Sequence, residues 1–194
     1  MKTLITGGVR SGKSRYALER AQAVFPDQPK CFIATAEPCD EEMRARILRH
    51  QKDRGNDFVT LEEPIRLAEA VASAEREFSV IVIDCLTFWM NNLLFRFSED
   101  PKQFDFQIQS FLKTLETAQE KTSCLMITNE VGCGLVGANP LDRQFVDRLG
   151  VLNQEIGRLC EEVILVVAGV PNSMKARHCF VGGQGGIEIV RLDS

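Results

Sequence analysis

The 194-residue chain is long enough for one domain with a full apolar core, since 44% of its residues are hydrophobic. The formal net charge of −4 argues against a dedicated nucleic-acid-binding protein, which usually carries a basic excess. No apolar run approaches the length of a membrane span, and Gly7 and Gly8 cut the N-terminal run too short for a signal peptide. We therefore expect a cytoplasmic protein without a membrane span and without a nucleic-acid partner.

Apolar runs recur along the chain with helical patterns between them. Strands are expected wherever a run is almost continuously apolar, as in a sheet covered on both faces: 3–6, 31–35, 80–84, 124–128 and 163–169, with 58–64 as a further short strand. Helices are expected where the apolar residues recur at helical spacing: 13–24, 40–54, 64–77, 86–96, 102–121 and 140–161. This alternation predicts the α/β class, as a doubly wound, mostly parallel sheet with helices on both faces.

The chain shows no internal repeat and no low-complexity linker, so we expect a single domain over 1–175. The tail 176–194 differs, because four glycines separate two β-prone runs and predict a terminal β-hairpin or a mobile end. The seven cysteines include no C-x-x-C pair and lie mostly in apolar segments, so neither a disulfide framework nor a zinc site is expected.

The first predicted strand leads into GGVRSGKS, which fits the phosphate-binding pattern G-x-x-x-x-G-K-S without a mismatch. The loop follows a strand and opens a helix, as this motif requires, and so predicts a P-loop NTPase fold of the RecA-like kind. Lys13 would reach the β- and γ-phosphates and Ser14 would ligate Mg²⁺. The alternative is a glycine-rich turn that binds nothing. The predicted nucleotide-binding residues here are Gly7, Gly8, Val9, Arg10, Ser11, Gly12, Lys13 and Ser14.

Asp84 ends the apolar run VIVID, at the carboxyl edge of the predicted sheet where ligands bind in open α/β folds. A P-loop needs a second acid for its metal, and Asp84 is the Walker-B candidate, holding Mg²⁺ directly or through water. The alternative is that Asp84 caps the helix that begins near Leu86.

On the helix predicted for 40–54, Arg46, His50 and Arg54 lie four residues apart and share one face. Two cations beside a histidine suit a bound anion, and they should lower the histidine pKa. A neutral imidazole near pH 7 is a potential nucleophile. The alternative is a solvated charged face.

A further polar cluster, Asn129 and Glu130, directly follows the strand predicted for 124–128. The helix beyond it carries Arg143 and Asp147 on one polar stripe, with Gly150 in its middle. A glycine inside a helix costs about 1 kcal/mol relative to alanine, so we expect another group to approach it closely. The alternative is an Arg143–Asp147 surface pair.

These segments occur in a specific order: ITGGVRSGKS, FIATAE, MRARILRHQKDR, TLEEP, IDCLTFWMNNLLF, TNEVGCGLV, DRQFVDRLGVLNQ and VVAGVPNSMK. The set resembles the bifunctional adenosylcobinamide kinase / adenosylcobinamide-phosphate guanylyltransferase family of cobalamin biosynthesis. The resemblance runs from about Met1 to Lys175. The P-loop alone is unspecific, whereas RIxxHxxxR followed by DCLTxWxxNLL and TNEVGxG is specific.

The resemblance implies a homotrimeric transferase that acts on a small corrinoid, with ATP and GTP as substrates and Mg²⁺ as cofactor. It implies phosphorylation of the aminopropanol hydroxyl of adenosylcobinamide, then transfer of GMP from GTP to that phosphate, giving adenosylcobinamide-GDP and pyrophosphate. The second step passes through a guanylyl-histidine, and the matching residue is His50. Thr35, Arg54 and Glu62 lie in segments that border the nucleotide in such proteins.

Two other functions remain open from the sequence. One is a small-molecule kinase that lacks the guanylyl step. The other is a RecA-like ATPase module that couples hydrolysis to conformational change or assembly. The acidic balance and the lack of a clear basic and aromatic surface count against the second.

Overall fold

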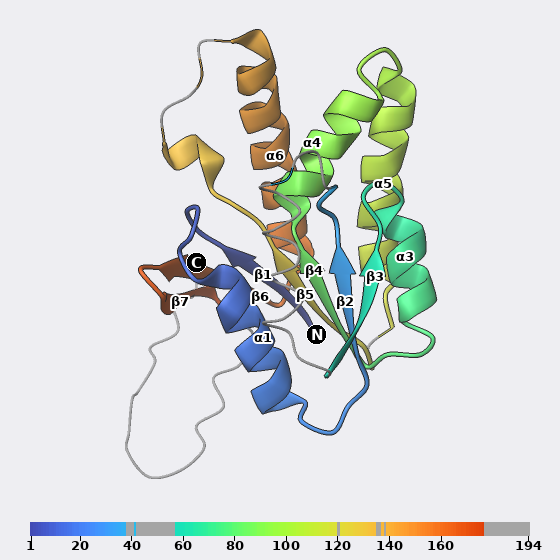
Figure 1. Ribbon diagram of the computed structural model, residues 1–194, viewed down its shortest axis with the longest axis vertical. Coiled ribbons are helices and arrows are strands. Elements are labelled where there is room, and N and C mark those ends of the chain that lie inside the picture. Colours follow the sequence, from blue (N-terminus) through green and yellow to red (C-terminus); the bar gives the residue numbers. More distant parts are fainter. Residues whose placement is uncertain (38–40, 42–56, 120, 135–136, 138, 177–194) are drawn as a thin grey trace.

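A mostly parallel β-sheet forms the middle layer of the chain, with helices on both of its faces (Figure 1). The computed structural model describes residues 1–37, 41, 57–119, 121–134, 137 and 139–176. Within them, seven strands lie in the order β3-β2-β4-β5-β1-β6-β7. Their bounds are β1 Lys2–Thr6, β2 Lys30–Ala34, β3 Phe58–Glu62, β4 Val80–Asp84, β5 Ser123–Ile127, β6 Glu162–Val167 and β7 Val170–Lys175.

All neighbouring strand pairs in this sheet are parallel except the antiparallel pair β6–β7. Successive side chains of a strand point to opposite faces, so the strands divide the apolar residues between two cores. In β4, Val80 and Val82 belong to the core beneath α1 (Lys13–Val24), whereas Ile81 and Ile83 belong to the core on the opposite face. The predicted P-loop α/β fold with a doubly covered sheet is therefore confirmed.

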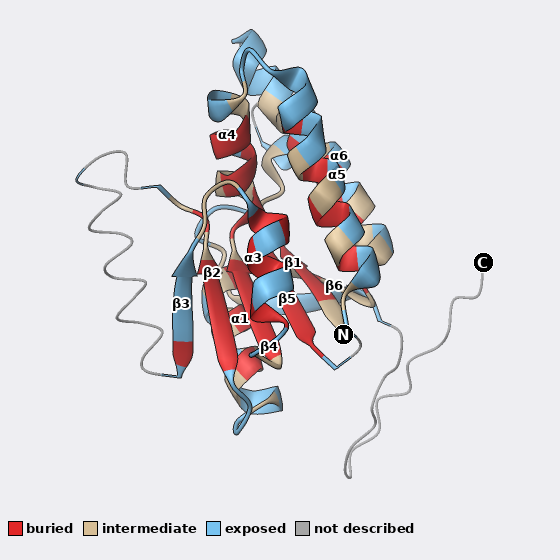
Figure 2. Cartoon of the chain, turned by 90° about the vertical axis from the view of Figure 1, so that its right-hand side faces the viewer, coloured by how far each residue is buried: buried red, intermediate tan, exposed pale blue. Residues whose placement is uncertain are grey.

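Four of the described helices cover the face opposite α1 (Figure 2): α3 Leu67–Ala74, α4 Leu86–Arg96, α5 Pro101–Thr117 and α6 Pro140–Leu159. Proline at the first position favours the start of α5 and of α6, and the side chains of Asp100 and Asn139 cap the two helices by accepting backbone N–H groups. None of the described helices is long and apolar enough to cross a membrane.

One strand of the described sheet is missing from the sequence predictions. The run predicted as a single strand over 163–169 ends at Val167, turns at Ala168 and Gly169, and returns as β7. Both turn residues have positive φ, 52° and 83°. Every side chain of β7 is exposed and Pro171 lies within it, so this edge strand has no apolar alternation to reveal it.

Most other predicted elements are found with shifted ends. The helix predicted over 64–77 is shorter, because Pro64 and the two residues after it precede α3. The helices predicted to end at 121 and 161 end at Thr117 and Leu159. The helix predicted over 40–54 falls outside the described residues except for Glu41, and the hairpin predicted over 176–194 falls outside them except for Ala176.

The cysteines among the described residues are free thiols, and all except Cys133 are buried. Burial raises the pKa of the Cys31 thiol to about 11 and the pKa values of the Cys85 and Cys160 thiols to about 12. The thiolate is the reactive form, and an apolar environment disfavours it.

In the folded protein at pH 8, we therefore expect a thiol-alkylating reagent to modify Cys133 well before Cys31, Cys85 or Cys160. Mass spectrometry of peptides after a short exposure measures the labelled fraction at each position. The same exposure in guanidinium chloride is the control, and there the four thiols should react at similar rates. Equal labelling of Cys85 and Cys133 in the native protein would contradict the buried environment of Cys85.

Candidate active site at the carboxyl edge of the sheet

The loop between β1 and α1 requires glycine at its tightest points. Gly7 has φ 147°, and a Cβ there would lie 2.3 Å from the carbonyl oxygen of Val166 in β6. Gly12 has φ 99°, and its Cβ would lie 3.2 Å from the Cα of Gly169. The loop can pass this close to the β6–β7 turn only because these two residues have no side chain.

The β6–β7 turn also holds the loop through a hydrogen bond. The N–H of Gly169 donates to the carbonyl oxygen of Ser11 at 2.8 Å. No role was predicted for Gly169 from the sequence. The local signal at this position is the glycine itself, because glycine readily adopts the positive φ that a tight turn requires.

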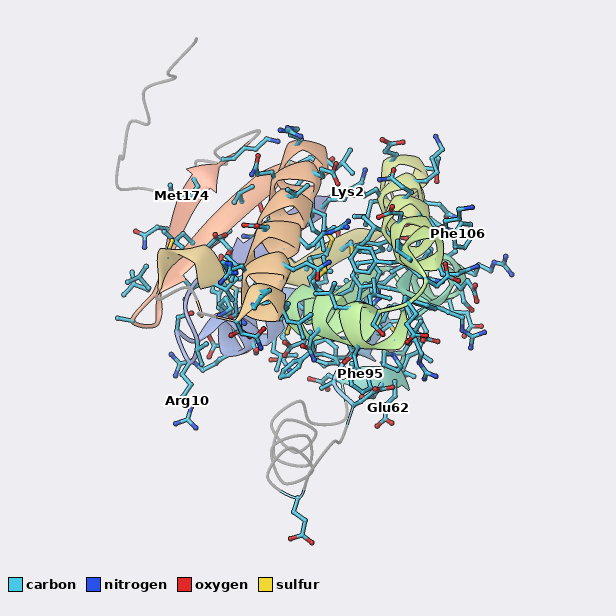
Figure 3. All side chains as sticks on the ribbon, turned by 90° about the horizontal axis from the view of Figure 1, so that it is seen from above. Lys2, Arg10, Glu62, Phe95, Phe106 and Met174 are labelled. Atoms are coloured by element: carbon cyan, nitrogen blue, oxygen red, sulfur yellow. The ribbon has the colours of Figure 1, made fainter. Side chains whose placement is uncertain are left out.

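Lys13 begins α1 with 7% of its surface exposed. Its ammonium group donates to the carbonyl oxygen of Gly8 at 2.6 Å and to Oγ of Ser11 at 3.4 Å, so the cation lies against the phosphate-binding loop. Ser14 follows it in the first turn of the helix, where the helix dipole favours anions. The exposed part of the loop is Gly8, Val9 and Arg10, and Arg10 projects from the molecule in Figure 3.

Asp84 is half-buried at the carboxyl end of β4. It does not cap α4, because Cys85 is the N-cap residue and no side chain caps that helix, so the capping alternative is wrong. Ile127 of β5 pairs with Asp84 on one side and with Ile5 of β1 on the other. Strand β5 therefore lies between the carboxylate and the phosphate-binding loop.

A hydroxyl and one carboxylate suit Mg²⁺, which is usually held by one or two carboxylates together with water and substrate phosphates. Ser14 in the first turn of α1 supplies the hydroxyl, and Asp84 at the end of β4 supplies the carboxylate. Elsewhere in the described part of the chain, no group of three or more His, Cys, Asp or Glu residues could hold a metal ion.

Thr35 is fully buried at the end of β2 and joins β2 to the start of α4. Its hydroxyl donates to the carbonyl oxygen of Cys85 at 2.7 Å and accepts from the N–H of Cys85 at 2.8 Å. The side-chain amide of Asn92 donates to the Thr35 carbonyl at 2.7 Å. Direct contact of this hydroxyl with a nucleotide would require its hydrogen bonds to the Cys85 backbone to break. Glu62, by contrast, is exposed at the end of β3 (Figure 3), and its register partner Ala34 also pairs with Asp84.

Glu130 connects the end of β5 to the phosphate-binding loop. Its N–H donates to the carbonyl oxygen of Gly7 at 3.2 Å, and its carboxylate accepts from Oγ1 of Thr6 at 2.7 Å. Beside it, the N–H of Asn129 donates to the Thr87 hydroxyl at 3.0 Å, and the carbonyl oxygen of Asn129 accepts from the Asn153 amide at 3.2 Å. The predicted pair after β5 thus lies at the loop, held by α4 and α6.

Two hollows flank α6. A hollow of about 410 Å³ lies between α6 and the segment that contains the 3-10 helix η1 (Val131–Cys133), and Asn129, Glu130 and Asp147 line it. A hollow of about 650 Å³ lies between α6, α5 and α4, and Arg143 and Asp147 line it. The structure therefore places Asn129 and Glu130 in one hollow, Arg143 in the other and Asp147 in both.

The close approach expected at Gly150 is not made by the described chain, because beyond the two chain neighbours and the helix's own backbone no described atom lies within 4 Å of the position of its missing Cβ. Arg46, His50 and Arg54 lie outside the described residues.

Comparison with known proteins identifies the family of the chain. Residues 3–174 match the family described as cobinamide kinase / cobinamide phosphate guanyltransferase. The chain belongs to this family. It is therefore a transferase of cobalamin biosynthesis with these kinase and nucleotidyltransferase activities, as the resemblance implied.

The chain is similar to the bifunctional adenosylcobalamin biosynthesis protein CobP of Pseudomonas aeruginosa, with 39% identity over 90% of this chain and 98% of the relative. It is 35% identical to the bifunctional adenosylcobalamin biosynthesis protein CobU of Escherichia coli, over 90% of this chain and all of the relative. Among solved structures, a KaiC-like protein of Pyrococcus horikoshii has a TM-score of 0.47 and 14% identity, over 84% of this chain and 69% of that chain.

Replacing Thr35 by valine keeps the shape of the side chain and leaves the buried N–H of Cys85 without its partner, whereas the Cys85 carbonyl still accepts from the N–H of Trp89. We expect the free energy of unfolding, measured in urea, to fall by about 1–3 kcal/mol. The matched control is Thr117→Val, where the exposed hydroxyl only bonds carbonyls of its own helix, and its effect should stay within about 0.5 kcal/mol. Equal effects of the two substitutions would show that the Thr35–Cys85 pair contributes no special stability.

Proposed function

We propose that this chain phosphorylates the aminopropanol hydroxyl of adenosylcobinamide with ATP or GTP, and then transfers GMP from GTP to the new phosphate through a guanylyl group on His50. The observation that carries the proposal is the position of Lys13, buried against the P-loop at the edge where Glu130 and Asp84 also lie. The match over residues 3–174 supplies the substrate class.

In the kinase step, the acceptor hydroxyl attacks the γ-phosphorus, the bond to the β-phosphate oxygen breaks, and the nucleoside diphosphate leaves. The protein needs mainly to position the phosphates and to stabilise the charge of the transition state. Lys13 and the loop amides do this at the β- and γ-phosphates. Ser14 and Asp84 would hold Mg²⁺, which supplies further positive charge to the same oxygens.

In the guanylyl step, an imidazole nitrogen of His50 attacks the α-phosphorus of GTP, and the bond to the β-phosphate oxygen breaks. The departing pyrophosphate carries the charge that the P-loop already binds. Arg46 and Arg54, on the same predicted helix face as His50, offset charge on the α-phosphate. The corrinoid phosphate then attacks the guanylyl phosphorus and releases the neutral imidazole.

We also propose that the chain assembles as a homotrimer in the cytoplasm, as the family resemblance implies. Size-exclusion chromatography with light scattering measures the subunit number directly.

Replacing Lys13 by alanine should remove both activities, because both steps need the triphosphate on one loop. We expect the rate of each step to fall at least about 100-fold at saturating nucleotide. The control is Lys113→Ala, which removes an exposed lysine that pairs with Glu116 on α5 and should leave both rates unchanged. Near-normal kinase turnover in the Lys13 variant would refute the shared use of the loop.

Replacing His50 by asparagine separates the proposed bifunctional enzyme from a kinase alone. The variant should still phosphorylate adenosylcobinamide, but it should form no acid-labile guanylyl-protein and no adenosylcobinamide-GDP. The measurement is covalent label per subunit from GTP labelled at the α-phosphate, with GTP labelled at the γ-phosphate as the comparison.

The matched control is His178→Asn, the other histidine of the chain, which should retain the label. Undiminished label in the His50 variant would assign the nucleophile to another residue. Absence of label in an active wild-type enzyme would leave only the kinase function.

A further inference from the structure

We propose that the two hollows along α6 form one acceptor site for the corrinoid. The hollow between η1 and α6 would take the hydroxyl-bearing arm, and the hollow between α4, α5 and α6 would take one edge of the macrocycle. This assignment rests on the proposed function, since the substrate class comes from it.

The smaller hollow is linked to the phosphate-binding loop through Glu130. Its wall includes Glu130, whose N–H bonds the carbonyl of Gly7 and whose carboxylate bonds Thr6. In a phosphoryl transfer, the attacking oxygen must come within about 3–3.5 Å of the phosphorus, in line with the leaving group. A hollow whose wall includes a residue bonded to the loop is therefore well placed for the acceptor arm.

Gly150 forms part of the wall opposite Glu130. Its missing side chain leaves open space, because beyond the two chain neighbours and the helix's own backbone no described atom lies within 4 Å of the Cβ position. A glycine in the middle of a helix is destabilising by about 1 kcal/mol relative to alanine. At this position, the glycine keeps the hollow wide where any larger side chain would narrow it.

The larger hollow adjoins the smaller one along α6, because Asp147 and Val151 line both. These residues are one helical turn apart, so they form the ridge between the two faces of α6. Helix α6 contacts η1 on one side and α4 and α5 on the other (Figure 1). A ligand can thus lie across α6 with its arm at the loop and its body over α5.

The lining of the larger hollow suits a corrinoid better than a second nucleotide. It combines apolar side chains such as Met90, Ile108 and Leu152 with amide and charged groups that can pair with the amide side chains of a corrin. Its charged residues are Asp105, Asp147, Glu155, Arg143 and Arg148. Because carboxylates outnumber the guanidinium groups, and Arg148 already pairs with Asp105, a triphosphate would be repelled.

The volume of about 650 Å³ lies within the range of roughly 300–1,000 Å³ found for small-molecule sites. The hollow is open to solvent, and Val151 on its rim is 55% exposed. A corrinoid would therefore rest in it by one edge, with the remainder of the macrocycle outside.

The test narrows the site at two points. Gly150→Leu fills the smaller hollow, and Val151→Trp blocks the junction between the two. Equilibrium dialysis with dicyanocobinamide measures corrinoid binding without turnover, and steady-state kinase assays give KM for cobinamide and for ATP. We expect both variants to weaken dicyanocobinamide binding and to raise KM for cobinamide about tenfold or more, with KM for ATP within about twofold of wild type.

Two controls separate a blocked site from a damaged fold. Gly157→Ala changes the other glycine of α6, in the last turn of the helix, whose Cβ would meet Leu4 and Val163 at ordinary contact distance. Ala72→Leu adds a leucine at an exposed position of α3, which lines neither hollow. Both should keep wild-type corrinoid binding, and thermal unfolding should show all four variants folded.

Unchanged cobinamide KM and binding in both blocking variants would overturn the acceptor site and leave the proposed kinase function intact. A selective rise in KM for ATP would overturn it in favour of a nucleotide site. If the wild type binds dicyanocobinamide in a Gly150-dependent manner but shows no kinase turnover, the site is supported and the proposed function fails.

Discussion

The common register of β1, β5 and β4 is the constraint on which the candidate site depends. Ile127 pairs with Ile5 on one side and with Asp84 on the other, so the three strands end at the same level. Parallel strands that are joined through helices all direct their carboxyl ends to one edge. The phosphate-binding loop, Asp84 and Glu130 meet there although they are far apart in the sequence. A slip of one residue in β5 would turn Ile127 out of its core and separate the groups.

The loop is held from two sides by backbone hydrogen bonds to other parts of the chain. Glu130 bonds the carbonyl of Gly7 from the end of β5, and Gly169 bonds the carbonyl of Ser11 from the β6–β7 turn. A loop fixed in this way needs little reorganisation when phosphates arrive, which is the condition for strong electrostatic stabilisation. The antiparallel hairpin at the edge of the sheet thus supports the loop, and a Cβ at either loop glycine would push the two apart.

The sequence predicted the features that local signals encode. The apolar runs reveal the buried parallel strands, because a strand covered on both faces has no polar side. The P-loop motif consists of eight consecutive residues, so it can be recognised from the sequence alone. Strand β7 lacked such a signal, since its exposed side chains and Pro171 follow from its edge position. The bonds of Thr35 to Cys85 join residues fifty positions apart, and no local pattern predicts them.

Gly150 shows a second limit of sequence reasoning. A glycine inside a helix indicates that a side chain would be unfavourable at that position. It does not tell whether a neighbouring group lies in contact there or whether the space must remain open. The packing of α6 against η1 decides between them, and here the space is open.

The acceptor site along α6 also bears on why a covalent histidine would be used in the second step. In the proposed kinase step, the acceptor would reach the γ-phosphorus, at the end of the triphosphate, from the smaller hollow. In the proposed guanylyl step, reaction would occur at the α-phosphorus, two phosphates further along the nucleotide, while the corrinoid arm would be longer by only one phosphate. With the macrocycle over α5 and α4, the arm would not reach this second reaction centre. A nucleophile on a separate segment would remove this mismatch, because it would carry the guanylyl group to the acceptor and let one phosphate-binding loop serve both transfers.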